Sequence, residues 1–299
     1  MSDQVGHRTA FETAIDAAPD EANGYAVLGD WLSQQGDPRG ELIALQRLSE
    51  LDRRQRERVK ALLYEPSIRC LAGPLAQWRW GFVHTATLVR PAGPGASERI
   101  DLARLLAHPS LRFLRALTLG QEPLFEALDA LAAAAPRVLA SLTLYSPRVL
   151  ELSRVPSTLP SLTQLHLSVP EITGALGVMP RLDSMTLSFL SWDATTARGL
   201  FDANERRLTT LKLVVAGALE VEPLDAVLAL PRLEHLTLEA SEMGVDAIEA
   251  IAGSDAMNRL VTLDLSRSGL SERGAKRLLQ VARQLPRLSS LVLGDSADP

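Results

Sequence analysis

Leucine recurs in a fixed pattern from residue 83 onward. The pattern L-x-x-L-x-L, or a close variant of it, occurs nine times up to residue 293. The nine copies are VHTATL, LRALTL, LASLTL, LTQLHL, LDSMTL, LTTLKL, LEHLTL, LVTLDL and LSSLVL. In each copy the last two apolar residues are two positions apart, so both point to one side of a strand and the residue between them points to the other. The pattern therefore predicts nine strands, each with one buried and one exposed face.

The segments between the copies mostly predict helices. Apolar residues recur at helical spacing in residues 100–109, 122–136, 193–204, 246–253 and 271–286. The connections between Leu144 and Leu187 are shorter and contain five prolines, which favours 3₁₀ or extended turns there. Strands that alternate with wider helices predict a curved α/β stack, with a parallel sheet on its concave face and helices and turns on its convex face.

These copies resemble leucine-rich repeats. Their last residues are 20 to 31 positions apart, and all intervals but the first lie within the range of about 20–29 residues typical of that family. The resemblance covers residues 80–293, and the segment that begins with LVTLDL is most similar to the ribonuclease-inhibitor type of repeat. It implies a solenoid that serves in protein interaction. The family usually has Asn or Cys three residues after the last leucine; we expect less regular loops because this chain has Glu122, Pro147, Pro170, Leu190, Ala216, Ser241, Ser268 and Ser296 there.

The first 80 residues lack the pattern and predict four short helices. We expect these helices over residues 9–18, 21–35, 39–48 and 52–63. In the stretch GDPRGE that separates the second from the third, Gly36 suits the left-handed position after a helix. Asp37 can cap the next helix and Pro38 fits its first turn. The sequence favours a joint between helices here over the alternative, a contact surface that includes Arg39.

Residues 9–48 resemble a small helical repeat-companion domain that precedes leucine-rich repeats in some bacterial proteins. The similarity rests on the DWL, GD-x-RGE and LQ elements of EANGYAVLGDWLSQQGDPRGELIALQ, and on WRWGFVHTATL, which leads into the first strand. The resemblance implies no defined activity. Because the first unit of a repeat stack would expose its apolar side, we expect residues 1–80 to form an all-α capping domain, with Trp78 and Trp80 at its junction with a repeat domain of residues 81–299.

Composition excludes several classes of protein. The 299 residues are 46% hydrophobic and 22% charged, which is typical of a chain with a large core. A formal net charge of −5 argues against general nucleic-acid binding. The single cysteine, Cys70, excludes an internal disulfide and a cysteine zinc cluster, and its apolar neighbours predict a small buried side chain. Neither a signal peptide nor a membrane-spanning apolar run is evident, so we expect a cytoplasmic protein.

No catalytic motif stands out. The five histidines lack the spacing of a metal site, and no G-x-S-x-G elbow is present. His166 and His235 are three repeats apart, which at about 4.8 Å per strand separates them by about 14 Å, too far to share a metal ion. The stretch GLSERGAK (residues 269–276) lacks the Lys-Ser or Lys-Thr end of a phosphate loop. The basic run from Arg53 to Lys60 predicts a solvated helix face, with an acidic partner as the alternative.

The concave face of the sheet is the candidate site. Threonine occupies five of its nine central positions, and such β-branched, weakly polar side chains also suit an exposed sheet without any partner. The candidates for partner contact are Tyr145, His166, Lys212, His235, Glu239 and Asp264. We expect Lys212 and His235 to lie side by side, with Glu239 near the end of the second of these strands and Asp264 one strand further.

These features predict a non-catalytic protein–protein interaction module that binds another protein through the concave face, without a cofactor or metal. Two alternatives remain open: a nucleotide- or ligand-binding regulator that uses the N-terminal domain, and a structural, self-assembling protein. Self-association is expected through the last strand, where only six residues follow Leu293 to cover its edge.

Overall fold

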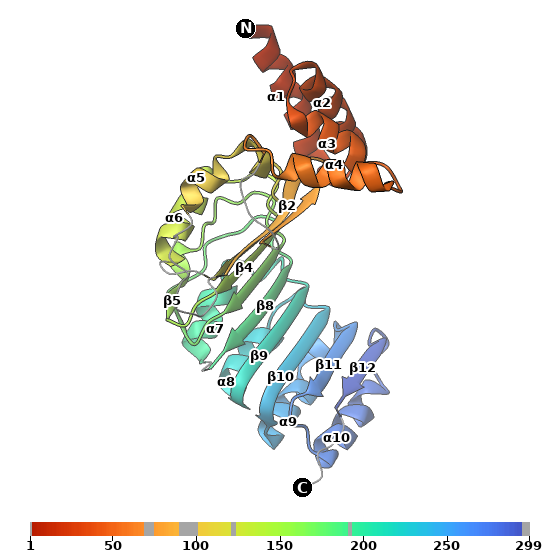
Figure 1. Ribbon diagram of the computed structural model, residues 1–299. Coiled ribbons are helices and arrows are strands. Elements are labelled where there is room, and N and C mark those ends of the chain that lie inside the picture. Colours follow the sequence, from red (N-terminus) through yellow and green to blue (C-terminus); the bar gives the residue numbers. More distant parts are fainter. Residues whose placement is uncertain (1, 69–74, 90–100, 121–123, 191–192, 295–299) are drawn as a thin grey trace, which may run out of the picture. The chain divides into compact units, whose positions relative to one another are not determined.

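The computed structural model describes residues 2–68, 75–89, 101–120, 124–190 and 193–294, which form a mixed α/β protein with a long, mostly parallel sheet (Figure 1). Contacts divide the chain into two units: residues 1–118 with 130–140, and residues 119–129 with 141–299. The boundary predicted after residue 80 falls inside the first unit, and the role of residues 1–80 as a cap on the first repeat stays a prediction. Cys70 lies outside the described residues.

The four helices predicted at the N-terminus are confirmed. They are α1 (Ser2–Ala17), α2 (Ala22–Gln34), α3 (Pro38–Gln46) and α4 (Arg53–Leu63). Gly36 has φ of 72°, as predicted for a residue just past a helix end. The Asp37 side chain accepts a hydrogen bond from the Arg39 N–H at 2.9 Å, with Pro38 in the first turn. Asp52 and Gln55 form a capping box at the start of α4.

The GDPRGE stretch is a tightly packed joint between α2 and α3. Arg39 is buried, its Nε lies 3.0 Å from Asp37 Oδ1, and its guanidinium lies 5.6 Å from the centre of the Phe82 ring. A Cβ at Gly40 would collide with Ser33 and with the carbonyl of Gly29, so the two helices approach closely only because this position is glycine. The arginine is therefore part of the packing and is not presented to a ligand.

Residues 76–80 do not continue the helical region, so the prediction of an all-α segment up to residue 80 is wrong at its end. Strand β1 (Ala76–Arg79) pairs antiparallel with β2 (Phe82–Val89), and Arg79 stands opposite Phe82. The two residues between them, Trp80 and Gly81, have φ of 48° and 79°. Positive φ at both positions is the geometry of a type I′ turn, whose twist suits a two-residue hairpin.

The core of the first unit joins the helices to the strands. Tyr25 packs with Phe82 and Phe113, and Trp80 lies against the same cluster. Three arginines of the first unit pair with carboxylates at the end of α1 or just after it: Arg112 with Glu12 and Asp16, Arg115 with Asp20, and Arg137 with Asp16. A smaller cluster places Trp78 against Leu42, Leu62 and Ile68.

The first unit also contains α5 (Leu102–Leu106). Strand β3 (Ala116–Gly120) and helix α6 (Leu124–Ala134) lie partly in the first unit and partly in the second.

The second unit is built on parallel strands in chain order. They are β4 (Ser141–Tyr145), β6 (Gln164–Ser168), β8 (Ser184–Phe189), β9 (Thr210–Leu219), β10 (His235–Met243), β11 (Thr262–Arg267) and β12 (Ser290–Leu293). Equivalent residues of the leucine pattern stand opposite one another across the sheet: Leu142, Leu165, Met185, Leu211, Leu236, Leu263 and Leu291. The predicted positions and parallel order of these strands are confirmed.

The connections differ along the second unit. Between β4 and β8 they are short pieces, β5 (Leu150–Glu151), a 3₁₀ turn (Leu152–Arg154) and β7 (Ile172–Thr173), as the prolines predict. Beyond β8 they are α7 (Ala194–Phe201), α8 (Val221–Leu228), α9 (Val245–Gly253) and α10 (Glu272–Ala282), which lie on one side of the sheet (Figure 1). Helix α8 was not predicted from the sequence, although Val221, Leu224 and Val227 have helical spacing.

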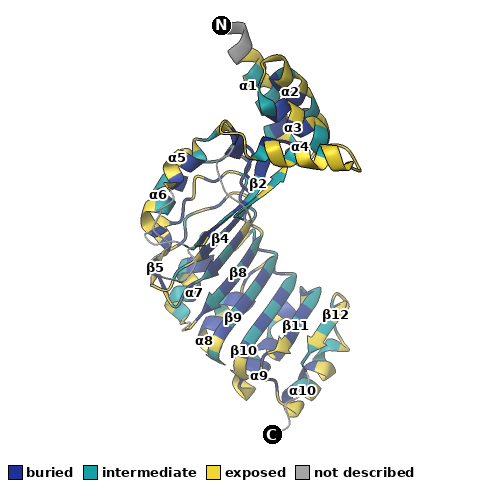
Figure 2. Ribbon diagram, in the orientation of Figure 1, coloured by how far each residue is buried: buried dark blue, intermediate teal, exposed yellow. Residues whose placement is uncertain are grey.

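Burial follows the predicted alternation. The leucines of the pattern are buried in β4 to β11, and the residues between them are half-exposed (Figure 2). In β12 the pattern weakens, because Leu291 and Leu293 are only half-buried.

The loops after the strands are irregular, as predicted from the missing Asn. Strands β9 and β10 run on for 10 and 9 residues, so that Ala216 and Ser241 lie within strands. Ser268 is buried and its Oγ donates to the carbonyl of Leu265 at 2.8 Å. Glu122 and Ser296 lie outside the described residues.

A buried amide appears instead on the helical side. Asn204 is fully buried; its Oδ1 accepts from the Met179 N–H at 2.9 Å, and its Nδ2 donates to the Gly177 carbonyl at 3.1 Å. The side chain thus ties the end of α7 to the preceding connection.

Candidate partner-binding face

The open face is the side of the second unit's sheet opposite α7 to α10, formed by the outward side chains of β4 to β12. The strand period of two places these side chains in rows across the sheet. One row contains Thr143, His166, Thr186, Lys212, Thr237, Asp264 and Val292. All six predicted contact residues belong to strands of this sheet, and they form separate local groups.

Tyr145 and His166 form the first group. Their ring centroids are 5.8 Å apart with an interplanar angle of 56°, and Tyr145 is 40% exposed. His166 stands opposite Thr143, two residues before Tyr145, so the two rings meet diagonally across neighbouring strands. A half-exposed aromatic pair of this kind offers apolar surface with polar edges to a partner.

Lys212 and Glu239 form the second group. Lys212 Nζ lies 2.6 Å from Glu239 Oε1, and Arg267 Nη1 lies 4.0 Å from Glu239 Oε2. The prediction that Lys212 lies beside His235 is wrong, because in the observed register Lys212 stands opposite Thr237 and His235 stands opposite Thr210. The carboxylate of Glu239 is thereby held between two cations from the strands on either side.

His235 and Asp264 are engaged locally. His235 Nδ1 lies 2.9 Å from Thr262 Oγ1 on the next strand. Asp264 Oδ1 accepts from the Ser266 N–H at 2.9 Å, which shapes the end of its own strand. Asp264 lies one strand beyond Glu239, as predicted, but its neighbour in register is Thr237.

Arg267 belongs to this face and was not predicted from the sequence. By the alternation of β11, Ser266 would share the side of Asp264. The register between β10 and β11 shifts after Thr237, so that Arg267 stands opposite Glu239. An inserted residue of this kind reverses which side chains face outward beyond it, and nothing in the local residue pattern signals it.

Burial, with a smaller contribution from the charge of Lys212, lowers the pKa of His166 from its ordinary value of 6.5. The folded state thus favours the neutral ring. Neutral His166 therefore contributes fully to the free energy of unfolding at a pH above the pKa that it has in the unfolded chain. This contribution is lost as the pH falls through the lower pKa that His166 has in the folded protein. Burial similarly lowers the pKa of His84 and His108.

Replacing Lys212 with methionine is expected to raise the pKa of His166 while leaving it below 6.5, since burial is the larger cause. An NMR titration of the imidazole proton signals measures the change. Lys276→Met is the matched control, because that lysine pairs with Glu272 on α10 and is expected to leave His166 unchanged. An unaltered His166 titration in Lys212→Met would show that the two side chains do not interact.

The two histidines of this face lie apart. His166 and His235 lie on β6 and β10, three strands apart. Within the described parts of the chain, no three His, Cys, Asp or Glu side chains are placed to hold a metal ion. In GLSERGAK, Ser271 accepts from the Gly274 N–H as the cap of α10, and Gly269 has φ of 58°, so both serve the turn into the helix.

The basic run on α4 is a solvated helix face. Arg58 Nη2 lies 2.6 Å from Glu41 Oε2 and Lys60 Nζ lies 3.1 Å from Glu57 Oε1, all with exposed side chains. Such exposed pairs contribute about 0–1 kcal/mol. Across the described residues, no helix combines the length and the apolar character needed to span a bilayer.

Comparison with known proteins supports the fold. The chain is similar to the crystal structure of a protein from Bacteroides fragilis, with a TM-score of 0.51 and 18% sequence identity. The match covers 64% of this chain and 62% of that chain, so less than two thirds of that protein is represented here. No protein-family model matches the sequence, and no curated protein matches it. At this identity the likeness shows a shared α/β fold.

Proposed function

We propose that the chain is a leucine-rich-repeat protein that binds another protein through its open face and performs no catalysis. The observation that carries the proposal is the row of half-exposed side chains across seven parallel strands, which presents a broad surface without a reaction centre. Parallel sheets usually have both faces covered, so a sheet with helices on one side only leaves a face available to a partner.

The polar groups of the open face support recognition of a protein surface. The aromatic pair at Tyr145 and the charged group at Glu239 lie on different strands, separated by threonine and serine positions. Separated anchors of this kind suit an extended surface rather than a small molecule, which needs converging groups. Charged groups at an interface act mainly on specificity and on the rate of association.

Exchanging the two charges of the Lys212–Glu239 pair tests the proposal. Lys212→Glu alone would bring two carboxylates together, since Lys212 and Glu239 are in contact. The double change Lys212→Glu with Glu239→Lys keeps the net charge and an ion pair between these two positions but reverses the charges that a partner meets. It gives up only the longer contact of residue 239 with Arg267, at 4.0 Å. We expect thermal unfolding close to that of the native chain and an affinity for the captured partner at least about tenfold weaker, because mismatched charges at an interface are costly.

The control exchanges another exposed pair, Arg58→Glu with Glu41→Arg, which joins α4 to α3. The native chain, the open-face variant and the control are used as bait, and the captured protein is then titrated against each. A partner that binds the open-face variant with native affinity and salt dependence would contradict the use of this face.

Self-association through β12 stays a second proposal. Leu291 and Leu293 are half-buried, in contrast to their buried counterparts in β11. Within the described residues β12 is the last strand of the sheet, and half-exposed apolar residues on such a strand favour pairing with another strand.

A further inference from the structure

A basic groove lies between α9 and α10. Its volume is about 520 Å³, and its charged lining consists of Arg273, Lys276, Arg277, Arg283 and the single carboxylate of Glu249. Val245 and Leu279 also line it, and they are 57% and 45% exposed. Exposed apolar side chains among charged ones are typical of an interaction surface.

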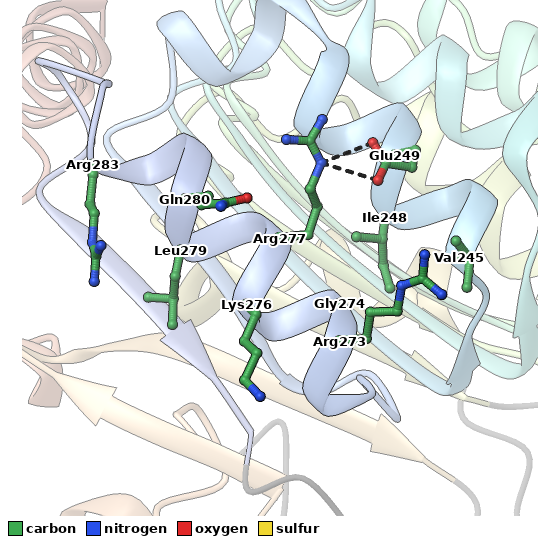
Figure 3. A pocket seen from close by; sticks show the side chains of 10 residues that line it. All are labelled: Val245, Ile248, Glu249, Arg273, Gly274, Lys276, Arg277, Leu279, Gln280 and Arg283. Carbon is green, nitrogen blue, oxygen red and sulfur yellow. Dashed lines mark hydrogen bonds and ion pairs between the residues drawn. The ribbon is translucent and has the colours of Figure 1, made fainter.

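The cations of this groove do not meet at one point (Figure 3). Arg277 extends toward Glu249, with its Nε 3.0 Å from Oε2, whereas Lys276 and Arg283 extend away from α9. Lys276 pairs with Glu272 on its own helix, and among the described residues Arg273 and Arg283 make no ion pair. A small anion requires converging donors, so this arrangement fits a broader acidic surface.

An acidic groove lies between α7 and α8 of the same unit. Its volume is about 430 Å³, and its charged lining consists of Asp202, Glu205, Glu222, Asp225 and the single cation of Arg198. Glu205 pairs with Arg206 at 3.7 Å. In the described part of the chain, Asp202, Glu222 and Asp225 make no ion pair. Ala226 and Ala229 provide a shallow apolar lining between these charges.

We propose that the basic groove at α9 and α10 of one copy of this chain binds the acidic groove at α7 and α8 of a second copy. The two linings are opposite in charge, four basic and one acidic against four acidic and one basic. Each contains charges that form no ion pair with another residue of the described ranges, and each has apolar side chains to bury. Since the whole chain carries a net charge of −5, two copies repel each other at long range. Their association therefore depends on this local complementarity, independently of the open face.

The same contact gives one of two assemblies. If the grooves meet reciprocally, each copy uses both and a closed dimer forms; if they meet head to tail, longer oligomers form. Sedimentation equilibrium of the full-length protein at low salt is expected to give a mass that rises with concentration. In about 0.5 M salt the mass is expected to fall toward that of the monomer, because screening then acts within a few ångströms.

Two charge-reversal variants test the contact from both sides. Arg273→Glu with Arg283→Glu makes both grooves acidic, and Glu222→Lys with Asp225→Lys makes both grooves basic. Each variant alone is expected to associate at least about tenfold more weakly than the native chain, because like charges then meet. An equal mixture of the two is expected to restore the association, since every acidic groove can then meet a basic one.

The control for net charge is Arg53→Glu with Arg54→Glu on the exposed face of α4. It changes the net charge of the chain by the same amount as the first variant. It is expected to associate like the native chain. All variants are compared by circular dichroism, and the mixture tests each fold directly because only folded chains can restore the contact. A native chain that stays monomeric at low salt, variants that associate as the native chain does, or a mixture that stays monomeric would each overturn the proposal. Association that ignores these charges would indicate the β12 edge instead.

Discussion

Replacing Phe113 with alanine is expected to lower the free energy of unfolding of the first unit by about 3–5 kcal/mol. Phe113 is 1% exposed, and its ring lies 4.8 Å from that of Phe82 and 5.4 Å from that of Tyr25, in both cases nearly edge-on. Edge-to-face aromatic pairs add about 0.5–1.5 kcal/mol each to the stabilisation that burial provides. The ring thus holds α2 against the first long strand and leaves a cavity when it is removed.

Denaturation followed by tryptophan fluorescence measures this loss, because Trp31 and Trp80 pack against the same cluster. Phe125→Ala is the matched control: Phe125 is 41% exposed and contacts Arg154 at the surface, so its loss is expected to cost less than about 1 kcal/mol. Equal effects of the two substitutions would show that the cluster does not hold the helices to the strands.

Replacing Asn204 with alanine is expected to cost about 2–4 kcal/mol. The change leaves the N–H of Met179 and the carbonyl of Gly177 without their partner, and each buried polar group left unsatisfied costs about 1–3 kcal/mol. The loss falls on the connection between β6 and β8, because that segment has no helix of its own to hold it in place.

Urea denaturation measures the cost, and amide exchange at Met179 reports the local loss. Asn258→Ala is the control, because Asn258 is exposed and its substitution is expected to change stability by no more than about 0.5 kcal/mol. If the two alanine variants unfold at the same urea concentration, the buried amide does not stabilise the connection.

The positions of the strands could be predicted from the sequence because leucine at a period of two leaves a strand only one way to bury its apolar side. The first leucine of most copies, such as Leu162 or Leu208, is buried as well, so the repeated pattern extends beyond the strand itself. The helix ends around Gly36 and Asp37 were equally predictable, because capping depends on neighbouring residues in the chain.

Features that depend on contacts distant in sequence could not be predicted. Asn204 lies in the polar stretch DANERR, which predicts an ordinary, exposed end of a helix. Its burial depends on a loop 25 residues earlier in the chain that folds over it. Strand β1 was missed because Trp-Gly is not one of the usual type I′ pairs, which are Asn-Gly and Asp-Gly.

The side-chain pairs of the open face depend on register. The sequence places Lys212, His235 and Glu239 on neighbouring outward positions, and only the pairing of Lys212 with Thr237 shows that the lysine reaches Glu239 rather than His235. The register shift that brings Arg267 to the same carboxylate could not be predicted from the alternation of side chains. A single inserted residue reverses which side chains face outward.

The order of the strands in the second unit has a consequence for how such a chain can change over generations. From β4 to β12, successive strands of the long sheet pair with one another in chain order, through interchangeable leucines. Duplication or loss of one whole strand with its connection would leave every other strand with an equivalent neighbour. Unequal recombination in the gene could therefore lengthen or shorten the sheet by whole units, and the area that faces a partner would grow or shrink in the same steps without a new fold.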